Sequence, residues 1–200
     1  QKEKLKRFNV IWIKNLNEIK KNYNIFIANE FFDALPIKQF FKINKKWMER
    51  FVVLEKNNKK KFINFDSNIK KVEKKIGFKI SKNQKIIEYS PLGLEYLKII
   101  SKKINKTKGG LLIIDYGYLE NSMKDTLMAI KKHNNSNVLN AFGNSDITHK
   151  LNFNILKKFT KNLKLKCQGI TTQKNFLTSL GINQRAEVLS KNLPFSKKAD

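Results

Sequence analysis

An amide and two carboxylates follow directly on a short apolar run in the segment NIFIANEFFDALP, residues 24–36. The run Ile25–Ala28 ends at Asn29 and Glu30, and Asp33 comes three residues after Glu30. Carboxylates can hold a guanidinium by charge-assisted hydrogen bonds and help it to lose a proton. The oxygen of a carboxamide can accept from an amine. The segment therefore predicts a site for a nitrogen-bearing group.

A second polar cluster, DYGY at residues 115–118, stands at the end of the apolar run 111–115. Asp115 adds another carboxylate, and the rings of Tyr116 and Tyr118 can cover a substrate cation. Tyrosines packed beneath a loop are the alternative interpretation. Uninterrupted apolar runs are typical of parallel strands covered on both faces. Because ligands bind at the carboxyl ends of such strands, we expect both clusters at ligand-binding edges.

The elements that position these clusters alternate between strands and helices. The helix after residue 90 is well marked, because Ser90 is a good N-cap and Pro91 suits the first helical position. Gly181 suits the end of the last predicted helix. The predicted strands are 25–28, 37–44, 46–55, 61–65, 84–90, 111–115, 146–153 and 165–170, and the predicted helices are 15–22, 91–108, 124–132, 154–163 and 173–180.

This alternation predicts an α/β fold with a mainly parallel sheet. Residues 37–90 differ, because their strands are joined by short turns such as 56–61, and we interpret them as an antiparallel β insertion. A chain of 200 residues with 15 Phe can bury one sizeable core, so one domain is the default.

The chain is strongly basic, with 42 Lys and Arg against 16 Asp and Glu and a formal net charge of +26. Such a charge is compatible with nucleic-acid binding. The excess is spread over the whole chain, and Lys, Asn and Ile are abundant together, as in AT-rich coding sequences. We therefore favour a compositional bias over a polyanionic partner.

The composition disfavours a membrane-spanning protein and excludes one that is held by internal disulfides. No apolar run approaches the roughly 20 residues of a membrane span, and the chain shows no apolar signal segment. The single cysteine, Cys167, excludes an internal disulfide and fits a reducing compartment. We expect Cys167 to be a buried thiol, because no activating neighbour is visible in LKLKCQGI.

The motifs ANEFFDALP, GGLLIIDYGY, DTLMAIKKH, DITHKLNF and TQKNFLTSLGINQRAEVL come in the order and spacing of the MidA-like family. The chain resembles these S-adenosylmethionine-dependent protein-arginine methyltransferases, which include a mitochondrial complex I assembly factor. The resemblance implies a class I methyltransferase (Rossmann-like) fold, S-adenosyl-L-methionine as cofactor, no metal, and symmetric dimethylarginine as product.

The same resemblance implies roles for the polar clusters. A capping role is the alternative, in which Asn29 or Asp33 caps a helical turn at 31–35 and Glu30 favours its N-terminus. The implied catalytic residues are Glu30, Asn29 and Asp33, the cofactor-binding residues Ala28, Asn29 and Phe31, and the substrate-binding residues Asp115, Tyr116 and Tyr118.

The resemblance covers only the second half of the family's domain. None of the eight glycines forms the GxGxG of a cofactor loop. Strands 25–28 and 111–115 would then be the fourth and fifth of the sheet, with residues 1–36 and 91–200 as the C-terminal half of the domain. We expect the Gly-rich loop and an acidic residue upstream in the coding DNA, and negligible cofactor binding and poor solubility for residues 1–200 alone.

The motif DITHKLNF departs from the usual family pattern. Lys150 stands at the usual histidine position and Asn152 at the usual aspartate. His149 is shifted by one residue, so on a strand it would face the opposite side. We assign no site role to His149 and expect His133 to be an ordinary surface histidine.

The predicted partner is a protein substrate with a target arginine, such as a respiratory complex I-type subunit, and a homodimer is left open. The predicted location is the cytoplasm of a bacterium, or the mitochondrial matrix of a eukaryote. Two alternatives remain: a methyltransferase acting on an amino group of nucleic acid, and a non-catalytic assembly or nucleic-acid-binding protein.

Overall fold

The computed structural model describes residues 1–20, 22–132, 134–140 and 143–191, so His133 lies outside the described residues. The chain divides into two compact units, Gln1–Cys167 and Gln168–Asp200, where one domain was expected. The second unit contains α4 (Gln173–Ser179) and α5 (Ile182–Ser190), which pack on each other and bury none of their residues. These helices therefore add nothing to the buried core of the first unit.

The first unit contains a parallel pair of strands, β1 (Asn24–Asn29) and β6 (Gly109–Ile114), as predicted. Helix α2 (Pro91–Thr107) runs between them in sequence and begins at Ser90, whose hydroxyl accepts from Gly93 N at 3.0 Å. The expectation that β1 is covered on both faces is wrong. Its residues alternate between half-buried and exposed, and Ile25 and Ile27 are 70% and 69% exposed.

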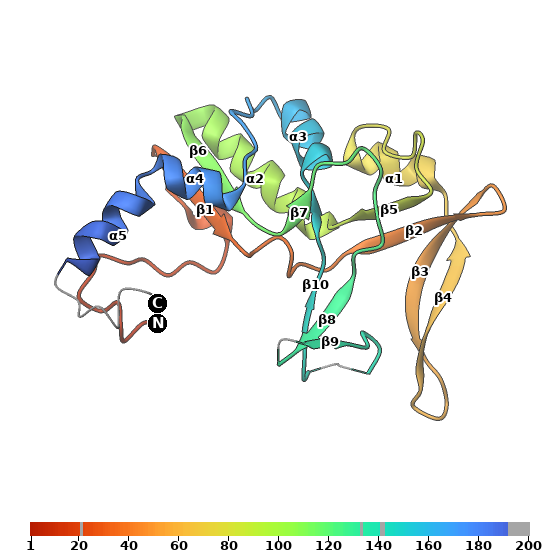
Figure 1. The fold of residues 1–200 in the computed structure, drawn as a ribbon. Helices are drawn as coiled ribbons and strands as arrows, with labels where there is room; N and C mark the ends of the chain where they lie inside the picture. Colours follow the sequence, from red (N-terminus) through yellow and green to blue (C-terminus); the bar gives the residue numbers. More distant parts are fainter. Residues whose placement is uncertain (21, 133, 141–142, 192–200) are drawn as a thin grey trace. The chain divides into compact units, whose positions relative to one another are not determined.

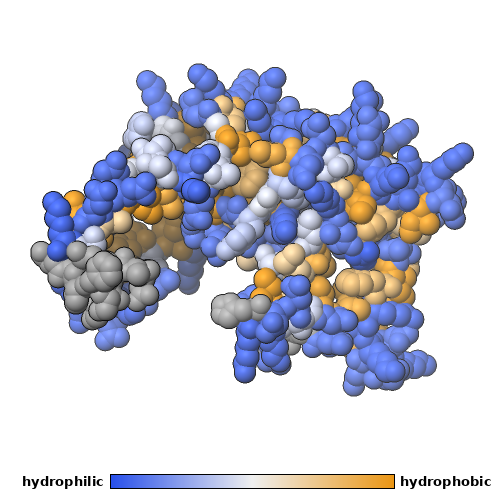
Figure 2. All heavy atoms as spheres, viewed as in Figure 1, coloured by the Kyte–Doolittle hydropathy of each residue, from blue (hydrophilic) through white to orange (hydrophobic). Residues whose placement is uncertain are grey.

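A four-stranded antiparallel sheet occupies the predicted insertion, in the order β4-β3-β2-β5. Its β3–β4 hairpin projects from the body of the unit (Figure 1) and carries exposed apolar side chains (Figure 2), including Phe51 and Phe65. The division of the chain into a methyltransferase half and an insertion stays a prediction. The strands are β2 (Lys38–Ile43), β3 (Lys46–Leu54), β4 (Lys60–Asp66) and β5 (Ile86–Tyr89).

Helix α1 (Ile69–Ile76) follows β4 and was not predicted. Asn68 caps its start by accepting from Lys71 N at 3.3 Å, and Gly77 ends it with φ of +93°. The helix buries Ile76 in the core. Its capping and its apolar spacing are local features, so this helix was readable from the sequence.

Small sheets and short elements complete the first unit. The strands β8 (Met128–Lys131), β9 (Asn134–Ser136) and β10 (Asp146–Thr148) form one antiparallel sheet, and β7 (Gly117–Tyr118) and β11 (Leu151–Asn152) form a parallel pair. Besides α1 and α2, the unit contains the 3-10 turn η1 (Leu16–Glu18) and the helix α3 (Phe153–Asn162), which Asn152 caps.

Four predictions in this region are wrong. Residues 124–132 form no helix, because β8 pairs with a strand on each side. The predicted strand 146–153 is broken at His149 and Lys150, and 165–170 forms no strand. Cys167 is exposed, since it lies in that irregular segment and not in a sheet.

The core of the first unit joins the sheet of the predicted insertion to α2 and α3. In the part of the chain that the structure describes, no helix is long and apolar enough to cross a membrane. The buried core cluster consists of Phe32, Phe40, Ile76, Ile80, Ile87, Leu94, Leu97, Met123, Leu151 and Phe159.

Candidate functional site

Strands β1 and β6 end together, because Asn29 is in register with Ile114. The N–H of Glu30 extends the pairing and donates to the carbonyl of Ile114 at 2.8 Å. Glu30 has φ of +45°, a left-handed conformation that is uncommon for a residue with a side chain. Both Asn29 and Glu30 are exposed. The chain therefore turns sharply at the end of β1 and leaves an amide and a carboxylate open to solvent.

Asp115 fixes the loop that follows Glu30. Its Oδ2 accepts from the N–H of Phe32 at 3.0 Å and of Asp33 at 3.2 Å, and its Oδ1 accepts from Tyr116 N at 2.8 Å. Partial burial and the nearby charge of Asp33 raise the pKa of Asp115. The three hydrogen bonds lower it, but the pKa stays above its ordinary value. In this structure the cap of the turn is therefore Asp115, and not Asn29 or Asp33.

Asp33 is buried, with 8% of its surface exposed. Its Oδ2 accepts from Thr148 Oγ1 at 2.9 Å, and its main-chain carbonyl accepts from His149 N at 3.1 Å. Its Oδ1 is buried without a hydrogen-bond partner among the described residues. Asp33 thus ties the loop to β10, while Asn29 and Glu30 remain accessible.

His149 also supports this loop, although the sequence gave no reason to assign it a role. The side chain is 7% exposed, and its Nε2 donates to the carbonyl of Phe32 at 3.1 Å. This contact joins residues 117 positions apart. A buried histidine that binds a distant carbonyl has no local sequence signal.

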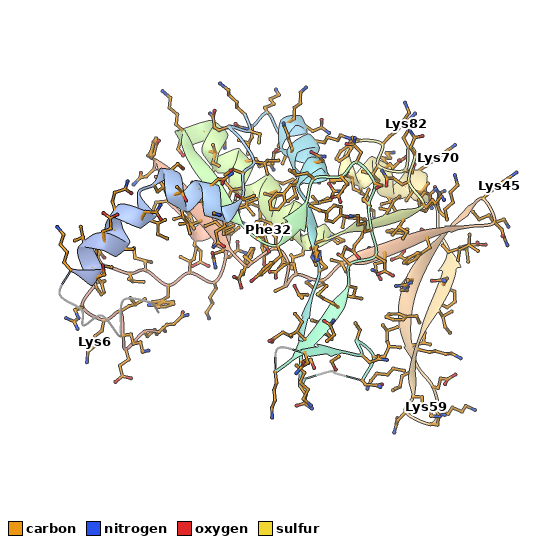
Figure 3. The ribbon with its side chains drawn as sticks, in the orientation of Figure 1. Lys6, Phe32, Lys45, Lys59, Lys70 and Lys82 are labelled. Atoms are coloured by element: carbon orange, nitrogen blue, oxygen red, sulfur yellow. The ribbon has the colours of Figure 1, made fainter. Side chains whose placement is uncertain are left out.

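Phe31 and Phe32 point to different environments. Phe32 is buried, lies near the centre of the view in Figure 3, and packs closely over Gly93, where an added Cβ would lie 3.3 Å from its ring. Phe31 is 42% exposed and contacts the rings of Phe32 and Tyr96 at centroid distances of 5.3 and 5.5 Å. Ala28 is half-buried against the core. The loop after β1 therefore exposes an aromatic ring as well as the amide of Asn29.

The tyrosines of the second cluster differ in exposure. Tyr116 is 60% exposed, whereas Tyr118 is half-buried. The hydroxyl of Tyr118 accepts from Lys124 N at 3.1 Å, and the Lys124 ammonium lies 5.1 Å from the ring centroid. Burial raises the pKa of Tyr118. Tyr118 therefore already covers a cation of this chain, while the ring of Tyr116 is open.

The two departures from the expected motif have structural partners. Asn152 caps α3 by accepting from Ile155 N at 3.1 Å, and its amide donates to the carbonyl of Glu120 at 3.1 Å. Lys150 has an exposed side chain, and its N–H donates to Thr126 Oγ1 at 2.8 Å. These contacts account for Asn152 at this position, and they do not involve the side chain of Lys150.

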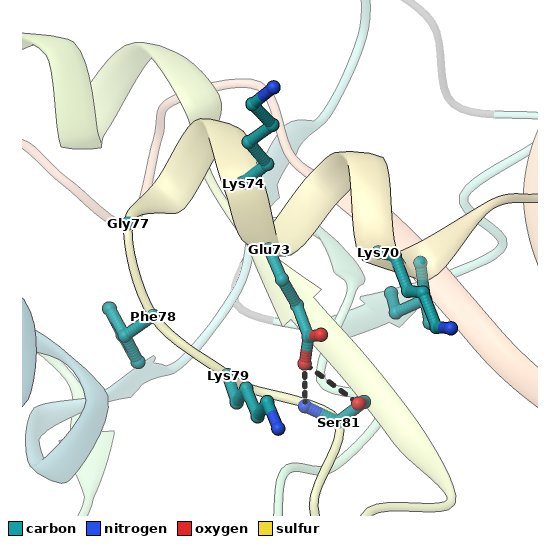
Figure 4. Close-up of a pocket in the computed structure, with 8 residues that line it drawn as sticks. Lys70, Glu73, Lys74, Gly77, Phe78, Lys79 and Ser81 are labelled. Atoms are coloured by element: carbon teal, nitrogen blue, oxygen red, sulfur yellow. Dashed lines mark hydrogen bonds between the residues drawn. The ribbon is translucent and has the colours of Figure 1, made fainter.

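Two cavities lie away from Asn29 and Glu30. One of about 50 Å³ is lined by Phe32, His149 and Asn152, among others, and has room for little more than a water molecule. The other is an open groove of about 680 Å³ beside α1, shown in Figure 4. In the described parts of the chain no group of His, Cys, Asp and Glu could hold a metal ion.

Residues 1–171 match a protein family described as S-adenosyl-L-methionine-dependent methyltransferases. The chain belongs to this family. Among similar proteins are protein arginine methyltransferase NDUFAF7, mitochondrial, from zebrafish (29% identical over 180 residues) and from human (28% over 182 residues), each aligned to 90% of this chain. A homologue of the same name from Caenorhabditis elegans is 30% identical over 179 residues, or 88% of this chain.

Two crystal structures from Burkholderia thailandensis show the same methyltransferase-family fold. One, of an uncharacterised protein, has a TM-score of 0.78 at 18% identity and covers 100% of this chain and 56% of its own. The other was solved with S-adenosyl-homocysteine bound and has a TM-score of 0.71 at 17% identity, over 94% of this chain and 51% of its own. The predicted α/β fold is therefore confirmed.

The chain spans about two fifths of the length of the curated relatives, 42% for zebrafish and 40% for human. The family and its fold are thus established for this methyltransferase chain.

Proposed function

We propose that the protein containing this chain is a protein-arginine N-methyltransferase that forms symmetric dimethylarginine on a subunit of a respiratory complex I type. The relatives named as arginine methyltransferases support the reaction class. The observation that carries the proposal is the exposed pair Asn29 and Glu30 at the shared end of β1 and β6. Among the residues that the structure describes, neither side chain makes a hydrogen bond of the kind that holds Asp33 and Asp115.

Glu30 is the proposed guanidinium ligand. An arginine side chain stays protonated at neutral pH, so its nitrogen must be held in one orientation and must lose a proton as it reacts. The Glu30 carboxylate binds the guanidinium by charge-assisted hydrogen bonds and compensates its charge. Glu30 has a left-handed backbone conformation, and its N–H donates to the carbonyl of Ile114. These two features turn the chain away from the strand and fix the position of the Glu30 backbone from which the carboxylate extends. Most of the rate then comes from positioning.

The second proposed ligand set comprises Asn29 and the aromatic rings. The carboxamide oxygen or the main-chain carbonyl of Asn29 accepts from the target nitrogen or from the cofactor. Asp115 and the open ring of Tyr116 are proposed to face the substrate side, with Tyr118 beside them. Asp33 binds the loop to β10 through Thr148, and its proposed catalytic contribution is to hold Glu30 in place.

S-adenosyl-L-methionine, the proposed cofactor, supplies an electrophilic methyl group. The residues at the end of β1 suit part of this molecule, because the ring of Phe31 and the side chain of Asn29 are exposed and Ala28 is half-buried against the core. They do not enclose it. We propose that a Gly-rich loop in the remainder of the protein completes the site.

The exposed face of β1 supports this half-domain proposal. Two-stranded parallel sheets are not stable by themselves, because parallel sheets are normally covered on both faces. Ile25 and Ile27 are exposed here, and β1 pairs with β6 alone. A further parallel strand and its helices would cover them. The proposed location is the mitochondrial matrix in a eukaryote or the cytoplasm in a bacterium, and a homodimer is left open.

The proposal is tested with the full-length protein, methyl-labelled cofactor and an extract of respiratory complexes. Label should appear in protein and fall strongly for Glu30→Gln, because the shape is kept and the charge is lost. Glu95→Gln, at an exposed position on α2, is the matched control and should keep full activity. Label found only on nucleic acid would favour the amino-methyltransferase alternative.

A further inference from the structure

The groove beside α1 is built by one carboxylate. Helix α1 ends at Gly77, whose N–H donates to the carbonyl of Glu73 at 2.8 Å, and the chain then turns back. The Glu73 side chain accepts from Ile80 N at 2.9 Å and from the N–H and hydroxyl of Ser81 at 2.9 and 2.7 Å. Figure 4 shows the two contacts with Ser81, which hold the returning segment against the helix. The groove is lined by Ile69, Lys70, Glu73, Lys74, Gly77, Phe78, Lys79 and Ser81.

The rim of the groove carries more positive than negative charge. Lys70 and Lys74 lie one turn apart on α1, and Lys79 comes from the returning segment. Glu73 is the one acidic residue among the described residues of the lining, so its single charge offsets only part of the three lysines, and its Oε1 accepts three hydrogen bonds. The ion pairs among the described residues involve other cations: Lys38, Arg50, Lys61 and Lys124.

The floor of the groove is apolar. Ile69 and Phe78 are half-buried, and the ring of Phe78 packs against Phe159 at a centroid distance of 6.4 Å. Ligands that pair with the lysines and also cover this floor need both carboxylates and apolar side chains. A nucleic-acid backbone would pair with the lysines alone and leave the apolar floor uncovered.

We propose that this α1 groove binds an acidic peptide segment in which carboxylates flank an apolar side chain. The carboxylates pair with Lys70, Lys74 and Lys79, and the apolar side chain lies on Phe78. This binding does not depend on the proposed methyl transfer, since it uses none of the residues at the end of β1.

The test measures fluorescence anisotropy of the full-length protein with a fluorescein-labelled peptide of alternating Glu and Leu. Each exposed ion pair contributes about threefold to affinity, so the variant Lys70→Gln, Lys74→Gln, Lys79→Gln should bind at least about tenfold more weakly. The matched control changes Lys56, Lys59 and Lys60 to Gln, which removes the same charge around the turn between β3 and β4. Figure 3 shows Lys59 at the far end of that hairpin, well apart from Lys70.

The control variant should keep the wild-type affinity to within about twofold, because exposed charges more than a Debye length away are screened. Equal weakening by both variants would overturn the proposal, since net charge alone would then explain binding. A peptide of alternating Glu and Ser should bind more weakly than the Glu-Leu peptide, and equal binding would refute the apolar floor. Tighter binding of a single-stranded RNA that displaces the peptide would assign the groove to nucleic acid instead.

Discussion

Replacing Asp115 by asparagine should loosen the loop that carries Glu30. The carboxylate accepts three main-chain N–H groups, from Phe32 and Asp33 through one oxygen and from Tyr116 through the other. An asparagine of the same shape has one acceptor oxygen, so its NH₂ group must face at least one of these donors. A hydrogen bond from an amide to a charged acceptor contributes about 1.5 to 3 kcal/mol.

Part of this loss is offset, because the substitution also removes a partly buried charge that lies close to Asp33. At a half-exposed carboxylate this burial and repulsion together are worth about 0.5 to 1 kcal/mol. The expected net cost of Asp115→Asn is therefore about 1 to 2 kcal/mol of unfolding free energy at neutral pH. Partial burial and the charge of Asp33 raise the pKa of Asp115 in the folded protein. The stability of the wild type relative to Asp115→Asn therefore depends on pH.

The sign of the pH dependence follows from the raised pKa. A carboxyl whose pKa is higher in the folded state contributes stability that is fully present below the unfolded value. This contribution is lost as pH rises through the folded pKa. The stability advantage of the wild type over Asp115→Asn should therefore shrink as pH rises from about 3.8, the ordinary value, through the raised pKa.

Urea unfolding of the full-length proteins, followed by circular dichroism, measures these differences. Asp146→Asn, at an exposed position on β10, is the control and should change stability by less than about 0.5 kcal/mol. Adding Asp33→Asn to Asp115→Asn should cost more than the sum of the two single changes, since each single change already relieves the one repulsion and the double variant can relieve it only once. An Asp115→Asn protein as stable as the wild type at neutral pH would refute the anchoring role.

Two other predictions concern the end of β1. Glu30→Gly should raise the unfolding free energy by up to about 1 kcal/mol, because glycine adopts φ of +45° without strain. The same change should abolish methyl transfer. A protein that is both less stable and inactive would instead support a structural role for Glu30. Residues 1–200 alone should be oligomeric and bind S-adenosyl-L-methionine too weakly for calorimetry, and Ile27→Lys should reduce the oligomer. A monomeric wild-type chain with micromolar affinity would contradict the half-domain proposal.

Apart from α1, whose local signals were missed, the sequence predicted the elements whose signals are local. β1 and β6 are continuous apolar runs, and α2 begins at a Ser-Pro cap, so each was found close to its observed bounds. The helix expected over 124–132 failed because β8 is defined by pairing with β9, which follows it, and with β10, which lies further along the chain. Propensity in a short segment does not report such partners.

In the candidate site, too, features with a local sequence signal were predicted, and contacts between distant segments were not. The position of Asn29 and Glu30 at the end of a strand could be read from the sequence, because it depends on where an apolar run stops. The partners of Asp115 could not, since its oxygens bind amides 82 and 83 positions away. The contact from His149 to Phe32 spans 117 positions and was missed for the same reason.

Amino-acid analysis of the methylated product tests the central claim most directly. The full-length protein is incubated with methyl-labelled cofactor and respiratory-complex subunits, and the labelled protein is hydrolysed to free amino acids. The account predicts label in symmetric dimethylarginine, and its loss for Glu30→Gln but not for Glu95→Gln. Label in lysine or in nucleic acid, or an undiminished yield from Glu30→Gln, would contradict it.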